Sequence, residues 1–143
     1  MSLEENKQVV ADFFQALRTC DLPAIDKLTT EDFMFRANDG KGGIDKKTFL
    51  TLIDGTLKAF PDHTSEIMDI VAEEDKVAVR MSADGTFKGE YMGFSPTGKY
   101  FKITEFFILR VKEGKIAEYW GVKDALGQFQ QMGIIPSLDE FRK

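Results

Sequence analysis

The first third of the chain places apolar residues at the spacing of amphipathic helices. The first such segment carries its apolar side chains at Val9, Val10, Phe13, Phe14 and Leu17. Because side chains three or four positions apart share one face of a helix, this spacing predicts a helix over about residues 3–18. Ser2 followed by Glu5 forms the capping-box pattern that begins such a helix.

Two further helical patterns follow. Asp21 is placed to cap a short second helix, and Asp45 is placed to cap a third helix that Pro61 ends. Between these helices, residues 33–36 predict a short strand, which is followed by a turn signal at Asn38 and a loop up to Asp45. We therefore expect three helices before the main part of the sheet.

From Thr64 onward the helical spacing gives way to alternation of apolar and polar residues, which is typical of strands. The expected strands span residues 64–74, 76–88, 99–112 and 115–124. Tight turns between them favour antiparallel neighbours, and a last short helix that ends near Gly133 is expected afterwards. This order predicts an α+β fold in one domain, residues 1–143, in which N-terminal helices close the concave face of a curved antiparallel sheet.

Composition narrows the class of protein. Hydrophobic residues make up 43% of the 143 residues and thirteen of them are phenylalanine, which predicts a large core, an apolar cavity or both. The formal net charge of −5, with no cluster of lysine and arginine, argues against binding to nucleic acid. Cys20 is the only cysteine, and the chain shows no leader or long apolar run, so we expect a cytoplasmic protein that does not enter a membrane. One cysteine and one histidine cannot build a His or Cys metal site, so no metal is expected.

Two carboxylates flank the only tryptophan on the last expected strand. Glu118, Trp120 and Asp124 lie at alternate positions and so share one face of that strand. A carboxyl group set among apolar side chains holds its proton more tightly, which makes Asp124 a candidate general acid or base. Asp124 also stands just before the last helix, where its carboxylate would instead cap that helix. Both roles are open on the sequence.

Glu105 is a second candidate for acid–base chemistry. It alternates in step with Phe107, so it becomes a carboxylate among aromatic rings if this side of the strand faces the helices. A bulge near Thr104 would instead turn Glu105 outward. The opposite side of the strand carries Phe106 and Ile108, and apolar residues on an outer sheet face predict a homodimer.

Several short motifs together resemble a known family. In chain order they are Phe60-Pro61-Asp62, the run from Gly89 to Lys99, Gly114-Lys115-Ile116, then Glu118, Trp120 and Asp124, and last Gln131-Met132-Gly133. With this order and spacing they resemble the SnoaL-like polyketide cyclase family of the NTF2-like superfamily. The resemblance implies a cone-shaped fold around a small-molecule pocket, and homodimers that pair sheet against sheet.

The resemblance also implies roles for particular residues. In characterised members, the aspartate at the position of Asp124 acts as the general acid or base, and Asn38 is similar in position to an asparagine that assists it. The histidine that these members carry on the neighbouring strand is absent here, where Phe107 or Arg110 stands instead. The expected substrate contacts are Trp120, Asn38, Phe107, Tyr91 and Phe14.

Two functions remain as alternatives. The first is a cofactor-free enzyme of the cyclase or isomerase type, which acts on a small apolar molecule with Asp124 and Glu105 as its catalytic residues. The second is a non-catalytic ligand-binding or assembly protein, whose cavity stores a ligand or is filled by its own side chains. Cavity volume helps to separate them, because a ligand site usually needs roughly 300 Å³ or more.

Overall fold

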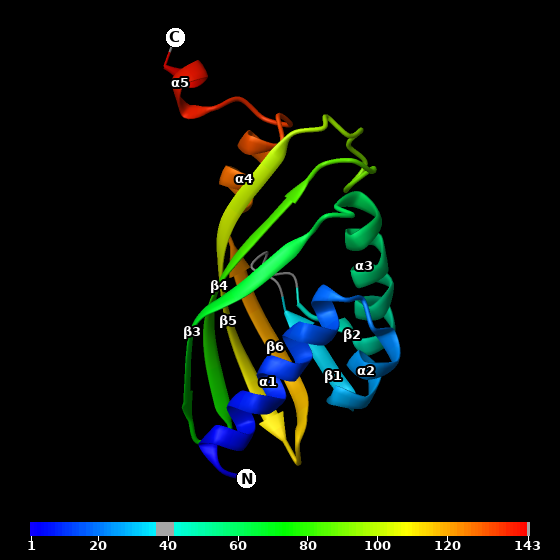
Figure 1. Cartoon of the computed structure of the whole chain (residues 1–143), viewed down its shortest axis with the longest axis vertical. Helices are drawn as coiled ribbons and strands as arrows, with labels where there is room; N and C mark the ends of the chain where they lie inside the picture. Colours follow the sequence, from blue (N-terminus) through cyan, green and yellow to red (C-terminus); the bar gives the residue numbers. More distant parts are fainter. Residues whose placement is uncertain (37–41, 143) are drawn as a thin grey trace.

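Helices cover one face of a six-stranded sheet in the computed structural model, which describes residues 1–36 and 42–142 (Figure 1). The helices are α1 (Leu3–Arg18), α2 (Leu22–Leu28), α3 (Lys46–Ala59), α4 (Ala125–Gln131) and α5 (Leu138–Phe141). The strands are β1 (Thr29–Arg36), β2 (Ile44–Asp45), β3 (Thr64–Glu73), β4 (Lys76–Thr86), β5 (Tyr100–Lys112) and β6 (Lys115–Lys123). The predicted α+β class is confirmed.

The predicted helix starts are confirmed by their capping hydrogen bonds. At the start of α1, the Ser2 hydroxyl accepts from the Glu5 N–H, and the Glu5 carboxylate accepts from the Ser2 N–H. Asp21 and Asp45 each accept a hydrogen bond from the backbone N–H three residues further on, at 3.2 and 2.9 Å. These bonds satisfy backbone donors that the first helical turn leaves free, so each helix begins where its cap stands.

The strand order is β2-β1-β6-β5-β4-β3, and every neighbouring pair is antiparallel except β1 with β6, which run parallel. The expectation of a purely antiparallel sheet is therefore corrected at this one pair. A parallel pair needs a long connection, and here most of the chain lies between β1 and β6. The strand expected at residues 33–36 begins earlier, at Thr29, and the expected loop before Asp45 contains the short strand β2.

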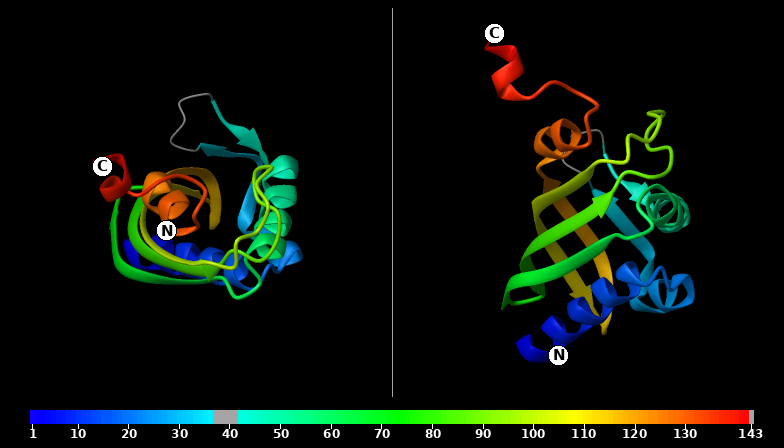
Figure 2. Two further views of the ribbon diagram at one scale, coloured as in Figure 1. Left: turned by 90° about the horizontal axis from the view of Figure 1, so that it is seen from above. Right: turned by 45° about the horizontal axis from the view of Figure 1, so that its top comes forward.

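The helix-covered face of the sheet holds two separate hydrophobic cores. The larger one lies under α1 and α3 and includes Phe13, which is fully buried and packs against four aromatic rings. The smaller one lies between the end of α3, β4, β5 and α4, and includes Phe60, Phe101 and Ile103. Both views in Figure 2 show the strong bend of the sheet around these elements.

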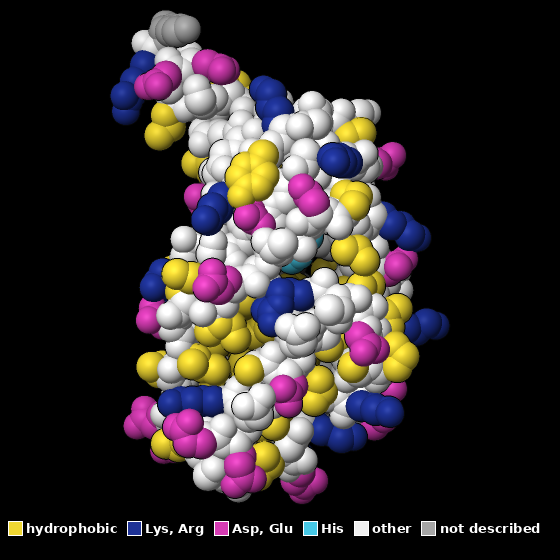
Figure 3. All heavy atoms as spheres, in the orientation of Figure 1, with side chains coloured by type: hydrophobic (Ala, Val, Ile, Leu, Met, Phe, Trp, Pro, Cys, Tyr) yellow, Lys and Arg dark blue, Asp and Glu magenta, His cyan; other side chains and the backbone are white. Residues whose placement is uncertain are grey.

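The surface carries mixed charge. Figure 3 shows lysine and arginine side chains interspersed with aspartate and glutamate over the face in view, without a basic patch. This agrees with the negative net charge of the chain. Within residues 1–36 and 42–142, no helix is long and apolar enough to cross a membrane.

Candidate functional site

A glutamate and a lysine interrupt the apolar surface between the two cores. Along β5, the residues that face the helices are Phe101, Ile103, Glu105, Phe107 and Leu109, so Glu105 lies where one core ends and the other begins. On β6, Lys123 is paired directly opposite Glu105 in the antiparallel register. Directly opposed residues have Cβ atoms about 5 Å apart, so the two charged groups share one small region. Of the two orientations that the sequence left open for Glu105, the structure has the inward one.

Glu105 is a partly buried carboxyl group on the helix-covered face. It is half-buried, and among the described residues no hydrogen bond or ion pair reaches its carboxyl group. Burial raises the pKa of Glu105, and the positive charge of Lys123 opposes this rise only in part. A carboxyl group with a raised pKa can exchange a proton closer to neutral pH than an ordinary glutamate can.

Tyr91, from the loop that joins β4 to β5, is the third polar residue here. Glu105, Lys123 and Tyr91 are together called the polar group below. The ammonium of Lys123 donates a hydrogen bond of 3.1 Å to the Tyr91 hydroxyl and lies 5.5 Å from the centre of its ring. The Tyr91 ring packs on Phe60, with ring centres 5.0 Å apart. Tyr91 and Phe94 also pair through two backbone hydrogen bonds, so the turn that carries the tyrosine is held locally.

Aromatic rings form the wall beside this polar group. The Phe107 ring lies 5.6 Å from Phe14 and 4.8 Å from Tyr119, measured between ring centres. Tyr119 is buried, and burial together with the charge of Glu105 raises the pKa of its phenol well above the usual value. Phe14 and Phe107, two expected substrate contacts, therefore lie together at the edge of the larger core.

Gly121 makes room for the Phe107 ring. A Cβ atom at position 121 would lie 2.4 Å from two carbons of that ring, which is far inside van der Waals contact. We expect Gly121→Ala to displace Phe107 and lower the free energy of unfolding by about 1–3 kcal/mol. Urea denaturation of both proteins would check this, and an unchanged midpoint would show that the wall is not tightly packed.

His63 lies close to the same region at the start of β3. It is half-buried, and burial lowers its pKa, although the charges of Asp84 and Asp62 oppose the shift. Lys123 also acts on its titration from nearby. His63 is therefore a second titratable side chain near Lys123, beside Glu105.

Asp124 lies at the end of β6 and takes the capping position that the sequence left open. Its carboxylate accepts a hydrogen bond from the Gly127 N–H at 2.9 Å and begins α4, and the residue is exposed. β6 ends at Lys123 and α4 begins at Ala125, so Asp124 does not continue the alternation of the strand. The structure therefore does not bring Asp124 into contact with Glu105.

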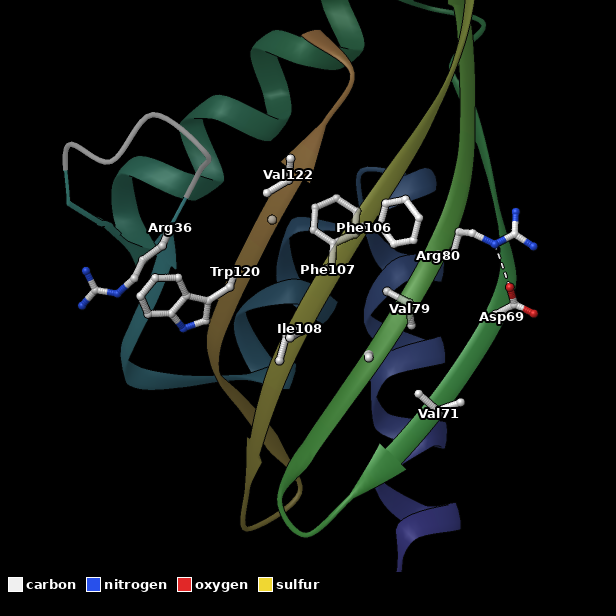
Figure 4. Close-up of a pocket in the computed structure, with 12 residues that line it drawn as sticks. Arg36, Asp69, Val71, Val79, Arg80, Phe106, Phe107, Ile108, Trp120 and Val122 are labelled. Atoms are coloured by element: carbon white, nitrogen blue, oxygen red, sulfur yellow. Dashed lines mark hydrogen bonds and ion pairs between the residues drawn. The ribbon is translucent and has the colours of Figure 1, made fainter.

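Trp120 lies on the other face of the sheet. It is 48% exposed, and the guanidinium of Arg36 sits 5.0 Å from the centre of its ring. Figure 4 shows both residues with Phe106, Ile108 and Val122 on the side away from the helices, where they line a groove of about 680 Å³. The expectation that Trp120, Asp124 and Glu105 share one pocket is corrected, because alternation places Trp120 and Glu105 on opposite faces.

Two more residues are compared with the site expected from the sequence, Asn38 and Lys123. Asn38 lies outside the residues that the structure describes. Lys123 was not among the expected site residues, although one sequence signal could have found it. Lys123 follows Tyr119 and Gly121 at alternate positions, and a lysine in step with an aromatic residue on a strand is unusual on a core-facing side.

Comparisons with known proteins agree with this fold. A family model described as SnoaL-like polyketide cyclase matches residues 8–132. AclR from Streptomyces galilaeus, a proposed hydroxylase, is 32% identical over 96% of this chain and 86% of its own, with a TM-score of 0.85. IdmH from Streptomyces antibioticus, a proposed polyketide cyclase, is 30% identical over 90% of this chain and 98% of its own, with a TM-score of 0.79.

A more distant structure shares the fold alone. The LEH-like epoxide hydrolase of M. tuberculosis is 17% identical over 91% of this chain and 90% of its own, with a TM-score of 0.72. A search of curated proteins found no match.

Proposed function

Since the chain belongs to the SnoaL-like polyketide cyclase family, we propose that it catalyses proton transfer on a small, mainly apolar carbonyl compound, with Glu105 as the acid or base. The observation that carries this proposal is the position of Glu105. It is a half-buried carboxyl group between two cores, without a hydrogen-bond partner among the described residues, and burial raises its pKa. A core-facing carboxyl group with a raised pKa is a candidate acid or base, which favours a functional role for Glu105.

The chemistry of relatives agrees with such a site. A proposed polyketide cyclase such as IdmH would act on a chain of ketones, and removal of a proton next to a ketone can begin ring closure. Glu105 in its ionised form would take that proton, and the electron pair would move onto the carbonyl oxygen. The reaction needs only an acid–base residue and a surrounding that keeps water away, so we propose no cofactor.

Asp124 has a structural role in this proposal. Its carboxylate is engaged with the Gly127 N–H and it lies at the surface, so it caps α4 while Glu105 does the proton transfer. The helix that it caps packs on β5 through the Gln131 side chain, which accepts a hydrogen bond from the Lys102 N–H at 2.8 Å. Asp124 thus helps to close the end of the sheet above Glu105.

The proposed function can be tested before the substrate is known. Enolisable ketones in deuterium oxide exchange the hydrogens next to the carbonyl, and proton NMR follows the loss of their signal. We expect the protein to accelerate this exchange for cyclic or aromatic diketones. Binding of such compounds without any acceleration would contradict the enzyme and favour the non-catalytic ligand-binding alternative.

We propose that two copies of the chain pair through the outer face of the sheet. Five large apolar residues are exposed on this face: Val71, Phe106, Ile108, Trp120 and Val122. They surround the groove seen in Figure 4, and a contiguous apolar surface of this kind is typical of a protein interface. A second copy would cover it with the same residues, as a twofold axis requires.

The proposed dimer predicts that one substitution halves the mass of the protein in solution. Sedimentation should give about twice the 16.2 kDa mass of the chain for the wild type and one chain mass for Phe106→Glu, because the new charge would be buried in the interface. Leu52→Glu on the exposed side of α3 is the matched control and should leave the dimer intact. A wild-type protein that sediments as a single chain at micromolar concentration would contradict the pairing.

A further inference from the structure

The groove on the outer face of the sheet has the size and the lining of a small-molecule site. Its volume in a single chain is about 680 Å³, and sites for small organic molecules usually measure roughly 300 to 1,000 Å³. Its walls are mostly apolar and include Val71 from β3, Phe106 and Ile108 from β5, and Trp120 and Val122 from β6. The chain therefore has room for a ligand on the face opposite to Glu105.

A second copy of the chain would close this groove without filling it. A twofold axis brings the same surface of each copy together, so in the proposed dimer one groove faces the other. Protein interiors are normally packed as densely as organic crystals, and an empty apolar space inside them lowers stability. The proposed pairing therefore encloses an apolar space that a ligand would fill with a gain in stability.

Two arginines line the groove, and the charge of one of them is paired. Arg80 Nε donates to the Asp69 carboxylate at 2.7 Å. Arg36 forms no ion pair within residues 1–36 and 42–142, and its Nε is buried without an acceptor there. The charged residues of the lining are these two arginines and Asp69, so the groove carries a net positive charge. Such a site favours an anion.

Arg36 lies next to an aromatic surface. It is paired with Trp120 in the register of β1 and β6, and its guanidinium carbon lies 5.0 Å from the centre of the indole ring. Figure 4 shows the two side chains together at one edge of the groove. The indole N–H donates to Glu118 at 3.1 Å, and Glu118 pairs with Arg110 at 3.2 Å, so this carboxylate is already engaged. A flat ligand against Trp120 can therefore direct an anionic group to Arg36.

We propose that the groove, closed by the second copy, is a ligand site for a flat, mainly apolar molecule with one anionic group, which Arg36 binds. The inference rests on the proposed pairing of two copies. It is independent of the acid–base role of Glu105, which lies on the other face of the sheet. Each copy contributes an apolar wall and one arginine, so the site is complete only in the dimer.

The test uses two fluorescent probes that share the same aromatic rings. Anilinonaphthalene sulfonate is the anionic probe, and phenylnaphthylamine lacks the sulfonate and is neutral. In fluorescence titrations, Arg36→Met should weaken binding of the anionic probe roughly 10-fold, because an ionic hydrogen bond is lost. Binding of the neutral probe should stay within about 2-fold, which also shows that the variant is folded. An anionic probe that binds Arg36→Met as tightly as the wild type, or an equal loss for both probes, would overturn the role of Arg36.

Two further lysine variants locate the site on the outer face. Lys27→Met removes a positive charge from the exposed side of α2, and Lys123→Met removes one from the helix-covered face of the sheet. Both should bind the anionic probe as the wild type does. Arg36→Lys keeps the charge and should retain more of the binding than Arg36→Met. If Lys123→Met loses the probe and Arg36→Met keeps it, the probe lies on the helix-covered face and the inference is wrong.

Sedimentation tests whether the second copy closes the site. At a protein concentration where part of the wild type is dissociated, the anionic probe should raise the share of dimer, because a ligand enclosed by two copies binds the dimer preferentially. A probe that dissociates the dimer would overturn the closed site, since it would compete with the second copy.

The outcomes also separate this inference from the pairing on which it rests. A wild type that stays a single chain but binds the probe through Arg36 would contradict the pairing and the closure, and leave Arg36 as the anion contact of an open groove. A dimer that binds the probe without any dependence on Arg36 would leave the pairing intact and overturn the ligand site.

Discussion

Glu105→Gln is expected to slow proton exchange on an accepted ketone by roughly 100-fold to 10,000-fold, the usual contribution of a positioned acid or base. Glutamine has the same size and can form hydrogen bonds, but it cannot take a proton from carbon. The position between two cores is preserved, so the loss would come from chemistry and not from packing. NMR exchange rates at saturating ketone would measure it.

A matched carboxyl-to-amide change provides the control. Asp124→Asn alters the cap of α4, where asparagine is about as good as aspartate, so exchange should stay within about 2-fold of the wild type and stability should fall by well under 1 kcal/mol. If Asp124→Asn loses exchange and Glu105→Gln keeps it, Asp124 is the acid or base and the assignment to Glu105 is wrong.

Glu105→Gln also has a pH-dependent effect on stability. Because burial raises the pKa of Glu105 in the folded chain, its contribution to stability is complete below the pKa of an unfolded glutamate and is lost as pH rises through the folded pKa. Glu105→Gln, which cannot ionise, should therefore gain thermal stability relative to the wild type on going from about pH 4 to pH 8. Melting curves at both pH values would show this.

The pH dependence of the exchange rate tests the Glu105 carboxyl group independently. As a base Glu105 acts in its ionised form, so kcat/KM should rise with pH and level off above its pKa. The inflection should lie above the value of about 4.3 for an ordinary glutamate. Lys123→Met should move it higher still, because the positive charge that opposes the rise is removed.

Phe13→Ala is expected to lower the free energy of unfolding by about 3–5 kcal/mol, the largest effect on stability among the substitutions considered. Phe13 is fully buried, and its ring lies 5.4 to 6.4 Å from those of Phe14, Phe33, Phe49 and Tyr119. The substitution leaves a cavity where α1, α3, β1 and β6 meet, and these aromatic neighbours cannot all collapse into it.

The melting temperature should fall by roughly 10–20 °C, given the usual relation for a domain of this size. Leu52→Ala provides the control, because Leu52 is 48% exposed on α3 and should cost less than about 1 kcal/mol. A fall of only a few degrees for Phe13→Ala would mean that the larger core repacks more freely than its ring contacts suggest.

Local signals in the sequence accounted for most of the elements. The capping patterns at Ser2, Asp21 and Asp45 predicted the starts of the first three helices, because a cap and its helix lie within a few residues of each other. Alternation and tight turns likewise predicted the strands from Thr64 onward. The parallel pairing of β1 with β6 was missed, because it joins segments that are far apart in the chain and have no hairpin between them.

The site was predictable in part. Alternation alone placed Glu105 in step with Phe107, and the structure puts both on the helix-covered face. The meeting of Glu105 with Lys123 depends on the register of β5 with β6, and the meeting of Lys123 with Tyr91 depends on the folded loop. Neither contact leaves a local signal in the chain.

The sequence by itself determined the order of the elements, their caps and the sets of residues that share a face, because these depend on spacing along the chain. The tertiary structure decided which face of each strand the helices cover. Near the end of β6, Trp120 and Val122 are the more hydrophobic pair, yet they face outward, and Tyr119 and Gly121 face the core with Lys123. The physical reason is that β6 must fit the inward face of β5, where Phe107 needs the space over Gly121.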